Sequence, residues 1–156
     1  MEFRRATIDD IPDLQKLIAR AINSITREGY TKEDLENWIR SYTYESTLER
    51  KIEDPDSYYI LLTDQGSIIG TGILTTTEIH GVYADPESPV PGIGTRIMDH
   101  LEKKARDSGI QEINIRASVT AAGFYKARGY IYIEDMEFDL EGYMAPGKIM
   151  IKKIVP

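Results

Sequence analysis

The sequence contains no cysteine, and this absence removes several kinds of chemistry at once. Without cysteine the chain has no disulfide framework, no thiolate nucleophile and no cysteine-ligated metal. Histidine is scarce as well, with two copies in 156 residues. Because cysteine and histidine are the main protein ligands of transition metals, we predict that the chain has no metal site.

Long apolar runs and an excess of positive charge are also missing. No stretch approaches the roughly 20 apolar residues of a membrane-spanning helix, and residues 1–5 are not followed by the apolar core of a signal peptide. The 26 acidic residues outnumber the 19 basic ones, and the formal net charge of −7 argues against nucleic acid as the main partner. We expect a cytoplasmic protein that has neither a membrane nor a nucleic-acid partner.

What the chain does contain is the composition of one ordinary globular domain. Of its 156 residues, 41% are hydrophobic and 29% are charged, which is enough to bury a single core. The sequence shows no internal repeat, no low-complexity tract and no interdomain linker. We predict one domain over residues 1–156.

Apolar residues at helical spacing predict three helices in the first third of the chain. The first begins around Pro12 and ends at Gly29. The second begins at Thr31, with Asp34 at capping-box spacing, and a short third helix covers residues 46–53.

The rest of the sequence is dominated by strand patterns. Together with the N-terminal segment, strands are predicted over residues 2–6, 58–63, 67–76, 78–84, 112–117, 130–140 and 148–155. The last two are expected to form a hairpin joined around residues 142–147. One helix should follow residues 91–95 and end near residue 109, and a short one should cover residues 119–127. This order predicts a mixed sheet with helices on its faces, an α/β or mixed α+β fold.

The most informative segment is Pro91-Gly92-Ile93-Gly94-Thr95, which stands before an amphipathic helix. Two glycines there leave backbone N–H groups uncovered at the positive end of the helix dipole, where they can hold a phosphate. A P-loop would need Lys and then Ser or Thr after the last glycine, and a dinucleotide fingerprint would need a third Gly or Ala. Neither is present. On this segment alone, an ordinary tight turn is an equal alternative.

A second segment of interest is residues 118–130, which contains the short predicted helix. Ala121 and Tyr125 lie four apart and share one helical face. Ala121 leaves room for a ligand, and the Tyr125 phenol, whose usual pKa is near 10, can protonate a basic leaving group. The alternative is that Phe124 and Tyr125 are core aromatics, which is the commoner role at helical spacing.

Three stretches, in order and at matching distances, resemble the GCN5-related N-acetyltransferase (GNAT) superfamily over essentially the whole chain. Residues 3–14 resemble its first strand and helix, residues 78–87 running into 92–94 resemble its fourth strand and pyrophosphate loop, and residues 118–130 are similar to its Ala-x-x-Phe-Tyr-x-x-x-Gly-Phe helix. The resemblance implies a central, mixed, largely antiparallel twisted sheet of about seven strands flanked by about four helices. It also implies acetyl-CoA as cosubstrate and an amine as acceptor.

The resemblance further implies which residues bind acetyl-CoA. Strand and loop backbone groups would pair with the pantetheine amides and the pyrophosphate, much as a peptide adds to a sheet edge. These residues are Val82, Tyr83, Ala84, Val90, Gly92, Ile93, Gly94 and Thr95, joined by Ser118, Ala121 and Phe124 from the later segment. The family has Arg or Gln where this chain has Pro89. Because Pro89 and Pro91 lack N–H groups, the affinity for CoA is in question.

For the reaction, the resemblance implies direct attack of an amine on the acetyl thioester, with Tyr125 protonating the departing CoA thiolate. A base must take a proton from the amine. Glu78 and His80 lie two apart on one strand face and are the candidates, His80 for its pKa range and Glu78 because the family often keeps an acid there. A solvated acid, a core histidine and a proton lost to water are the alternatives.

The sequence does not identify the acceptor, for which a small-molecule amine or a peptide amine is expected. Tyr30 and Trp38, in the aromatic and acidic segment 30–44, are predicted to face it, with the late hairpin near Tyr143. Two other interpretations stay open. One is a non-catalytic CoA-binding or regulatory module of the same fold, and the other is an acyltransferase with a different donor or an O-acceptor. A homodimer is also left open.

Overall fold

The computed structural model describes residues 1–25 and 29–154. Its centre is a seven-stranded sheet with the strand order β1-β2-β3-β4-β5-β7-β6. The strands are β1 (Glu2–Arg5), β2 (Ser57–Asp64), β3 (Ser67–Thr75), β4 (Glu78–Ala84), β5 (Glu112–Ser118), β6 (Ile131–Leu140) and β7 (Tyr143–Lys153). All neighbouring strands are antiparallel except β4 and β5, which run parallel.

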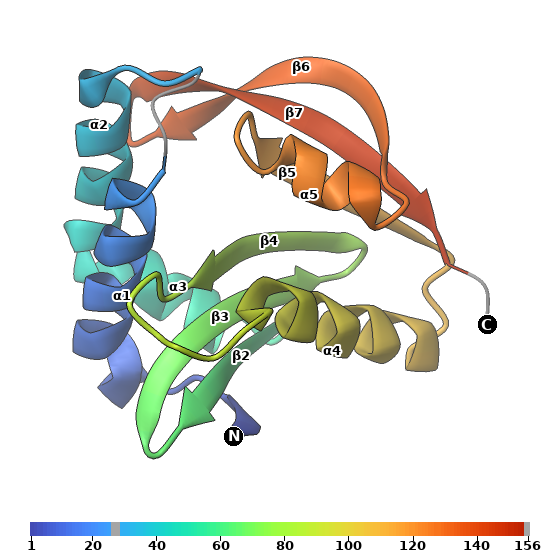
Figure 1. Cartoon of the computed structure of the whole chain (residues 1–156), viewed down its shortest axis with the longest axis horizontal. Coiled ribbons are helices and arrows are strands. Elements are labelled where there is room, and N and C mark those ends of the chain that lie inside the picture. Colours follow the sequence, from blue (N-terminus) through green and yellow to red (C-terminus); the bar gives the residue numbers. More distant parts are fainter. Residues whose placement is uncertain (26–28, 155–156) are drawn as a thin grey trace.

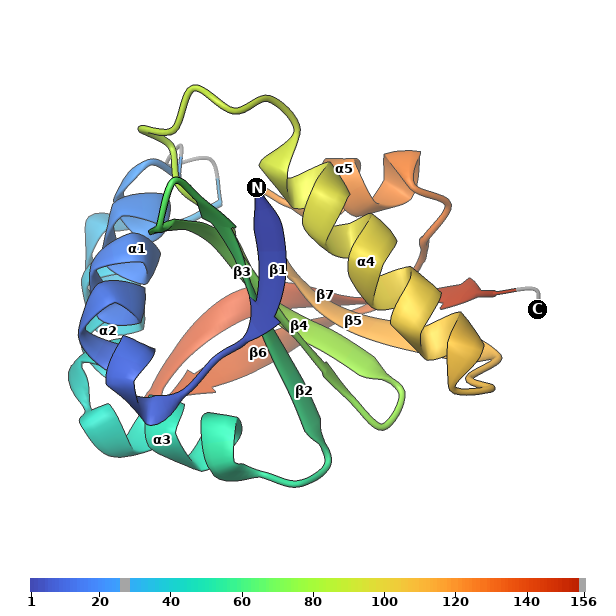
Figure 2. The same cartoon turned by 90° about the horizontal axis from the view of Figure 1, so that it is seen from below.

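Helices cover both faces of this sheet, as Figure 1 and Figure 2 show. The α-helices of the described residues are α1 (Ile11–Asn23), α2 (Lys32–Thr43), α3 (Glu45–Glu53), α4 (Ile93–Asp107) and α5 (Ala122–Ala127), with a 3₁₀ turn at Ile8–Asp10. In Figure 2, α1, α2 and α3 lie on one side of the sheet and α4 and α5 on the other. The predicted fold class, a mixed and largely antiparallel seven-stranded sheet between helices, is confirmed.

The sheet separates two apolar clusters. Leu14 and Ile22 of α1 are fully buried in one of them, and Ile97 of α4 is fully buried in the other. The helix α4 approaches the sheet closely because β3 carries Gly70 and Gly72, where a Cβ would lie 2.5 and 2.8 Å from atoms of Ile97. These glycines therefore set the distance between α4 and the strand next to β4.

The helix starts follow the predictions with small shifts. Thr31 Oγ1 accepts a hydrogen bond from the Asp34 N–H (3.1 Å), and the Asp34 carboxylate accepts one from the Thr31 N–H (2.9 Å), which is the predicted capping box of α2. The helix α3 begins at Glu45, one residue early. The helix α5 begins at Ala122, so the predicted start at Val119 is wrong, because the residues before Ala122 form a turn.

The first helix is shorter than predicted. The helix α1 ends at Asn23 instead of continuing to Gly29. Ser24 follows as the cap, and its hydroxyl donates to the carbonyl three residues earlier (2.7 Å), a local bond that competes with helix continuation. Part of the predicted extension, residues 26–28, lies outside the described residues.

The late hairpin also differs from the prediction. Strands β6 and β7 are joined by the two-residue turn Glu141-Gly142, whose φ angles of 53° and 95° are typical of a type I′ turn. The predicted loop over residues 142–147 is therefore wrong, since β7 already begins at Tyr143. Pro146 and Gly147 both lie in β7, and the Phe138 ring occupies the space that a Cβ on Gly147 would need.

The feature of the sheet that positions the site is the divergence of β4 and β5. These parallel strands pair only at Glu78–Asn114 and Ile79–Ile115. Beyond this point β4 is paired with β3 alone, and a bulge interrupts that pairing at Gly81, which has a φ of 61°. Because a bulge increases the local twist of a strand, it turns the second half of β4 away from β5.

Candidate active site

A cavity of about 830 Å³ opens where β4 and β5 diverge. One end, which we call the strand end, is lined by residues of β4, β5 and the α5 segment. The other, which we call the helix end, is lined by residues of α2, α3 and the β6–β7 turn. Of the predicted site residues, the cavity is lined by Trp38, His80, Val82, Tyr83, Ala84, Ser118, Ala121 and Tyr125.

Tyr125 lies at the strand end, on the short helix α5. Its residue is 7% exposed, and its ring packs edge-on against Phe124 and Tyr130 at centroid distances of 5.2 and 5.8 Å. No described residue forms a hydrogen bond with its hydroxyl. Burial raises the pKa of Tyr125 to about 12, with the positive charge of Arg128 opposing the shift. The phenol therefore keeps its proton at neutral pH and can donate it to a group in the cavity.

Glu78 and His80 lie together, as their spacing in β4 predicts. Glu78 Oε1 is 3.2 Å from His80 Nδ1, a close approach without the alignment of a hydrogen bond. The same oxygen accepts hydrogen bonds from Nε and Nη2 of Arg116 at 2.9 and 2.7 Å. Burial raises the pKa of Glu78, but His80 and Arg116 outweigh it and leave that pKa lowered. Because His80 lines the cavity, the arrangement suits a base at His80 with the charged Glu78 beside it.

The loop before α4 presents main-chain donors. Gly92 stands at the N-cap with a φ of 65°, and no side chain caps the helix. Among the described residues, the N–H groups of Ile93, Gly94 and Thr95 have no hydrogen-bond acceptor, as expected for a first helical turn. The Val90 N–H, in contrast, donates to Ser88 Oγ at 3.2 Å. The structure thus leaves fewer loop donors than the sequence suggested.

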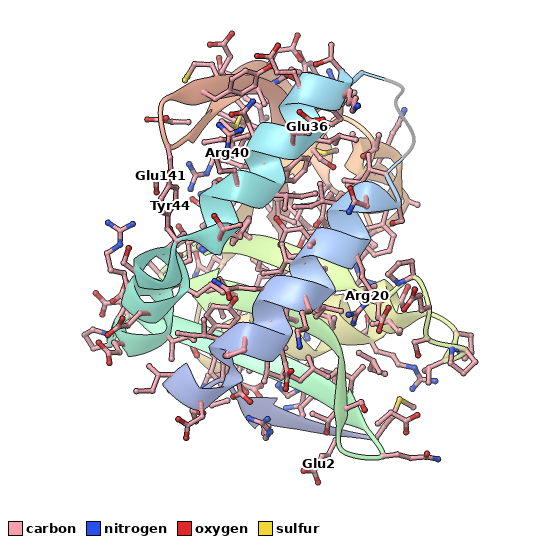
Figure 3. All side chains as sticks on the ribbon, turned by 90° about the vertical axis from the view of Figure 1, so that its left-hand side faces the viewer. Glu2, Arg20, Glu36, Arg40, Tyr44 and Glu141 are labelled. Carbon is pink, nitrogen blue, oxygen red and sulfur yellow. The ribbon has the colours of Figure 1, made fainter. Side chains whose placement is uncertain are left out.

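Two further contacts hold the loop in place. Arg20 of α1 bonds the Asp85 carboxylate through Nη2 (3.1 Å) and Nε (3.4 Å), and Figure 3 shows Arg20 on the side of α1 that faces this loop. At the start of α4, a Cβ on Gly94 would lie 3.5 Å from the Phe124 ring. Phe124, which is 37% exposed, therefore stands beside the first turn of α4.

Tyr30 does not line the cavity. It is 3% exposed, and its hydroxyl donates to the Pro146 carbonyl (2.6 Å) and accepts from the Val119 N–H (3.0 Å). Gly29 beside it has a φ of 87°, and a Cβ there would lie 2.7 Å from Val119 Cγ1. Tyr30 thus joins the segment before Ala121 to β7, and its position does not support the predicted contact with an acceptor.

Trp38 lines the helix end and belongs to a hydrogen-bonded group of aromatic residues. Its Nε1 donates to the Tyr83 hydroxyl (3.0 Å), which donates to the Tyr42 hydroxyl (3.1 Å). Burial, followed by the neighbouring Tyr42, raises the pKa of Tyr83. The backbone of Tyr83 lies in β4 at the strand end, so this residue connects the two ends of the cavity.

Several residues of the site escaped the sequence analysis. Arg116 lies two residues after Asn114 in β5 and so faces the same side of the sheet, but its pairing with Glu78 depends on the sheet register. Tyr42 follows Trp38 at helical spacing, which could have indicated it.

Within the described residues no helix is long and apolar enough to cross a membrane. The same residues include no group of three or more His, Asp or Glu side chains placed to hold a metal ion.

The sequence model of the acetyltransferase (GNAT) domain family matches residues 26–144. The chain therefore belongs to the GNAT acetyltransferase family, as the three matching stretches predicted. A search of curated proteins found no match.

Solved structures show the same fold at low sequence identity. A GCN5-related N-acetyltransferase (Aminotransferase, Class-II) from Rhodopseudomonas palustris superposes with a TM-score of 0.90 at 23% identity, covering 98% of this chain and 95% of the other. The PaiA N-acetyltransferase from Thermoplasma acidophilum, solved with coenzyme A, gives 0.80 at 22%, covering 98% of both chains. A ribosomal-protein-alanine N-acetyltransferase from Brucella melitensis gives 0.67 at 18%, covering 99% of this chain and 100% of the other.

Proposed function

We propose that this protein is an acetyl-CoA-dependent N-acetyltransferase that acts on a small-molecule or peptide amine. The observation that carries the proposal is the cavity at the divergence of β4 and β5, which brings Tyr125 and His80 to one opening. Membership of the GNAT family supports it. So does the coenzyme A bound by the Thermoplasma relative, whose fold this chain shares.

The residues at the strand end fit acetyl-CoA. Beyond Ile79, the β4 backbone groups that point away from β3 have no strand partner among the described residues, and the amides of pantetheine could bond there. The uncovered N–H groups of residues 93–95 suit a pyrophosphate, with Phe124 beside them, while Ser118 and Ala121 line the cavity itself. When bound, acetyl-CoA supplies an acetyl group on an activated thioester.

Three side chains at the strand end take part in the two proton transfers that the reaction needs, one from the amine and one to the departing thiolate. His80 accepts the proton that an alkylammonium acceptor must lose before it can attack. Glu78, which stays ionised because its pKa is lowered, stabilises the charged imidazole from 3.2 Å away. Tyr125 holds its proton until a basic sulfur departs beside it, since its pKa of about 12 keeps the phenol neutral.

A non-catalytic CoA-binding module is the second candidate, and the loop before α4 favours it. Pro89 and Pro91 lack N–H groups, and the Val90 N–H is already bonded to Ser88. Fewer donors for the pyrophosphate imply weaker cofactor binding. This candidate and the first differ in one measurable outcome, which is release of thiol from acetyl-CoA in the presence of an amine panel.

The proposal is tested by measuring acetyl-CoA binding to Gly94→Val by calorimetry. Valine adds methyl groups between the first turn of α4 and Phe124, and these groups would keep a phosphate away from the N–H groups of that turn. We therefore expect the affinity for acetyl-CoA to fall by about tenfold or more. Gly123→Val is the matched control, because Gly123 is also the second residue of a helix and a Cβ there meets nothing within 4 Å. Unchanged affinity in a folded Gly94→Val protein would remove the phosphate cradle from the proposal.

A further inference from the structure

One face of α3 turns three hydrogen-bond donors toward the helix end of the cavity. Thr47, Arg50 and Lys51 line the cavity, together with Asp54 at the C-cap of the helix. Their spacing of three, four and seven residues places them on one helical face. Arg50 and Lys51 bring two positive charges to this end of the cavity, and Thr47, one helical turn earlier in α3, adds a hydroxyl.

Three carboxylates also line the helix end and keep their negative charge, but each has a partner within the chain. Asp54 Oδ1 accepts the N–H of Asp56 (2.9 Å), and Asp139 Oδ1 accepts the N–H of Gly142 (2.8 Å), so both stabilise local turns. Glu141, at the β6–β7 turn (Figure 3), lies 3.8 Å from Arg50 Nη2, a loose pair between exposed side chains.

Two of the three donors, Lys51 and Thr47, lack such a partner among the described residues. Lys51 Nζ lies 5.3 Å from the centroid of the Tyr42 ring, and among the described side chains no carboxylate oxygen is within 4.0 Å of it. The ring holds the ammonium group in position without neutralising it. Thr47 Oγ1 is buried and has no hydrogen-bond partner among the described residues, which is costly unless a ligand supplies an acceptor.

We propose that the helix end binds an anionic group of the acceptor, so that the substrate is a small amine carrying a carboxylate on the same molecule. This rests on the proposed function for the amine, which would lie near His80 and Tyr125 in the same cavity. The Lys51 ammonium, the Arg50 guanidinium and the Thr47 hydroxyl are the donors that a carboxylate accepts from. A phosphate presents the same chemistry to these donors.

The competing explanation is structural. Basic residues in the last turn of a helix stabilise its negative C-terminal end, and Arg50 and Lys51 occupy that turn of α3. In that case their removal lowers the thermal stability and leaves the preference among ligands unchanged. A preference for one ligand charge over another is therefore the property to measure.

The experiment measures binding of matched amines to the full chain by saturation-transfer NMR and titration, with and without acetyl-CoA. The probes are β-alanine, aminoethylphosphonate, propylamine and diaminopropane, which have two methylene groups, or three in diaminopropane, between the amine and a terminal carboxylate, phosphonate, methyl group or second amine. Aminohexanoate, hexylamine and diaminohexane repeat the comparison with a longer spacer. Because probe binding is read without turnover, loss of acetyl-CoA binding and loss of anion binding are separate results.

We expect a probe that ends in an anionic group to bind about tenfold more tightly than the probe that ends in a methyl group, which is the scale of a charge-assisted hydrogen bond. Lys51→Met should abolish this preference, and Thr47→Val should weaken it. Lys104→Met should preserve it, since Lys104 stands over the Tyr58 ring at 5.0 Å outside the cavity. A tighter phosphonate than carboxylate would identify the anion as phosphate-like.

Three results would overturn the proposal. The first is a propylamine or diaminopropane affinity equal to that of β-alanine, with the same outcome for the longer spacer. The second is a Lys51→Met protein that keeps the preference for anions. The third is the absence of saturation transfer to every anionic probe in a protein whose melting temperature shows that it is folded.

Discussion

The strand end and the helix end of the cavity offer different parts of the chain to a ligand. At the strand end and in the neighbouring loop before α4, the main groups are those of the backbone, such as the diverging edge of β4 and the N–H groups of residues 93–95. At the helix end they are side chains, such as Lys51 and Trp38. Backbone groups are present whatever the residue type, whereas side chains change with each substitution. The strand end therefore offers groups that most substitutions leave in place, and the helix end offers groups that a single substitution can remove.

The largest expected effect is a loss of turnover when Tyr125, the proposed proton donor at the strand end, is replaced. Tyr125→Phe keeps the ring and removes the proton, so turnover should fall by roughly 10²-fold with little change in acetyl-CoA affinity. Thiol release and calorimetry measure the two quantities separately. Tyr132→Phe, at an exposed tyrosine, is the control. Normal turnover in folded Tyr125→Phe would reduce Tyr125 to a core aromatic.

The same contrast explains what the sequence could predict. The residues of the strand end and of the loop before α4 lie in short contiguous motifs, since Gly92 and Gly94 open one helix and Ala121 and Tyr125 are one turn apart. Local spacing is enough to find such residues. The divergence of β4 from β5 had only one local sign, the isolated Gly81 within a strand pattern, which indicates a bulge.

The helix end could not be predicted in this way. Lys51 and Tyr42 come from different helices, and the hydrogen bond between Trp38 and Tyr83 joins residues 45 positions apart. Such contacts depend on how α2 and α3 pack against the sheet, which residue spacing does not encode. From the sequence, residues of segment 30–44 are predicted to face the acceptor, but Lys51 belongs to the next helix.

The second prediction tests where the base lies. His80→Gln should lower turnover by about tenfold near neutral pH, and the defect should shrink at high pH, where more of the amine is already neutral. Glu78→Gln should have the smaller effect. Because the pKa of Glu78 is lowered, this group stays ionised at neutral and higher pH and adds no titration of its own to that part of the profile.

A pH series with the best amine of the panel makes this comparison. His100→Gln is the control, because that histidine stacks on Phe3 at 4.0 Å and does not line the cavity. If the His80 and Glu78 variants both follow the wild-type profile at every pH, neither is the base, and the amine loses its proton to water.

The smallest expected effect concerns Tyr83, where the two ends meet. Its hydroxyl bonds Tyr42 of the helix end at 3.1 Å, while its backbone lies in β4 at the strand end. A double-mutant cycle of Tyr83→Phe and Tyr42→Phe should give a coupling of about 1 kcal/mol in the free energy of unfolding, the usual net value of one hydrogen bond. Tyr58→Phe with Tyr42→Phe should be additive, because Tyr58 packs with the cluster on the opposite face of the sheet. If the free energies of unfolding are additive in the Tyr83 cycle as well, the two ends are energetically independent. The helix end could then be changed without affecting the strand end.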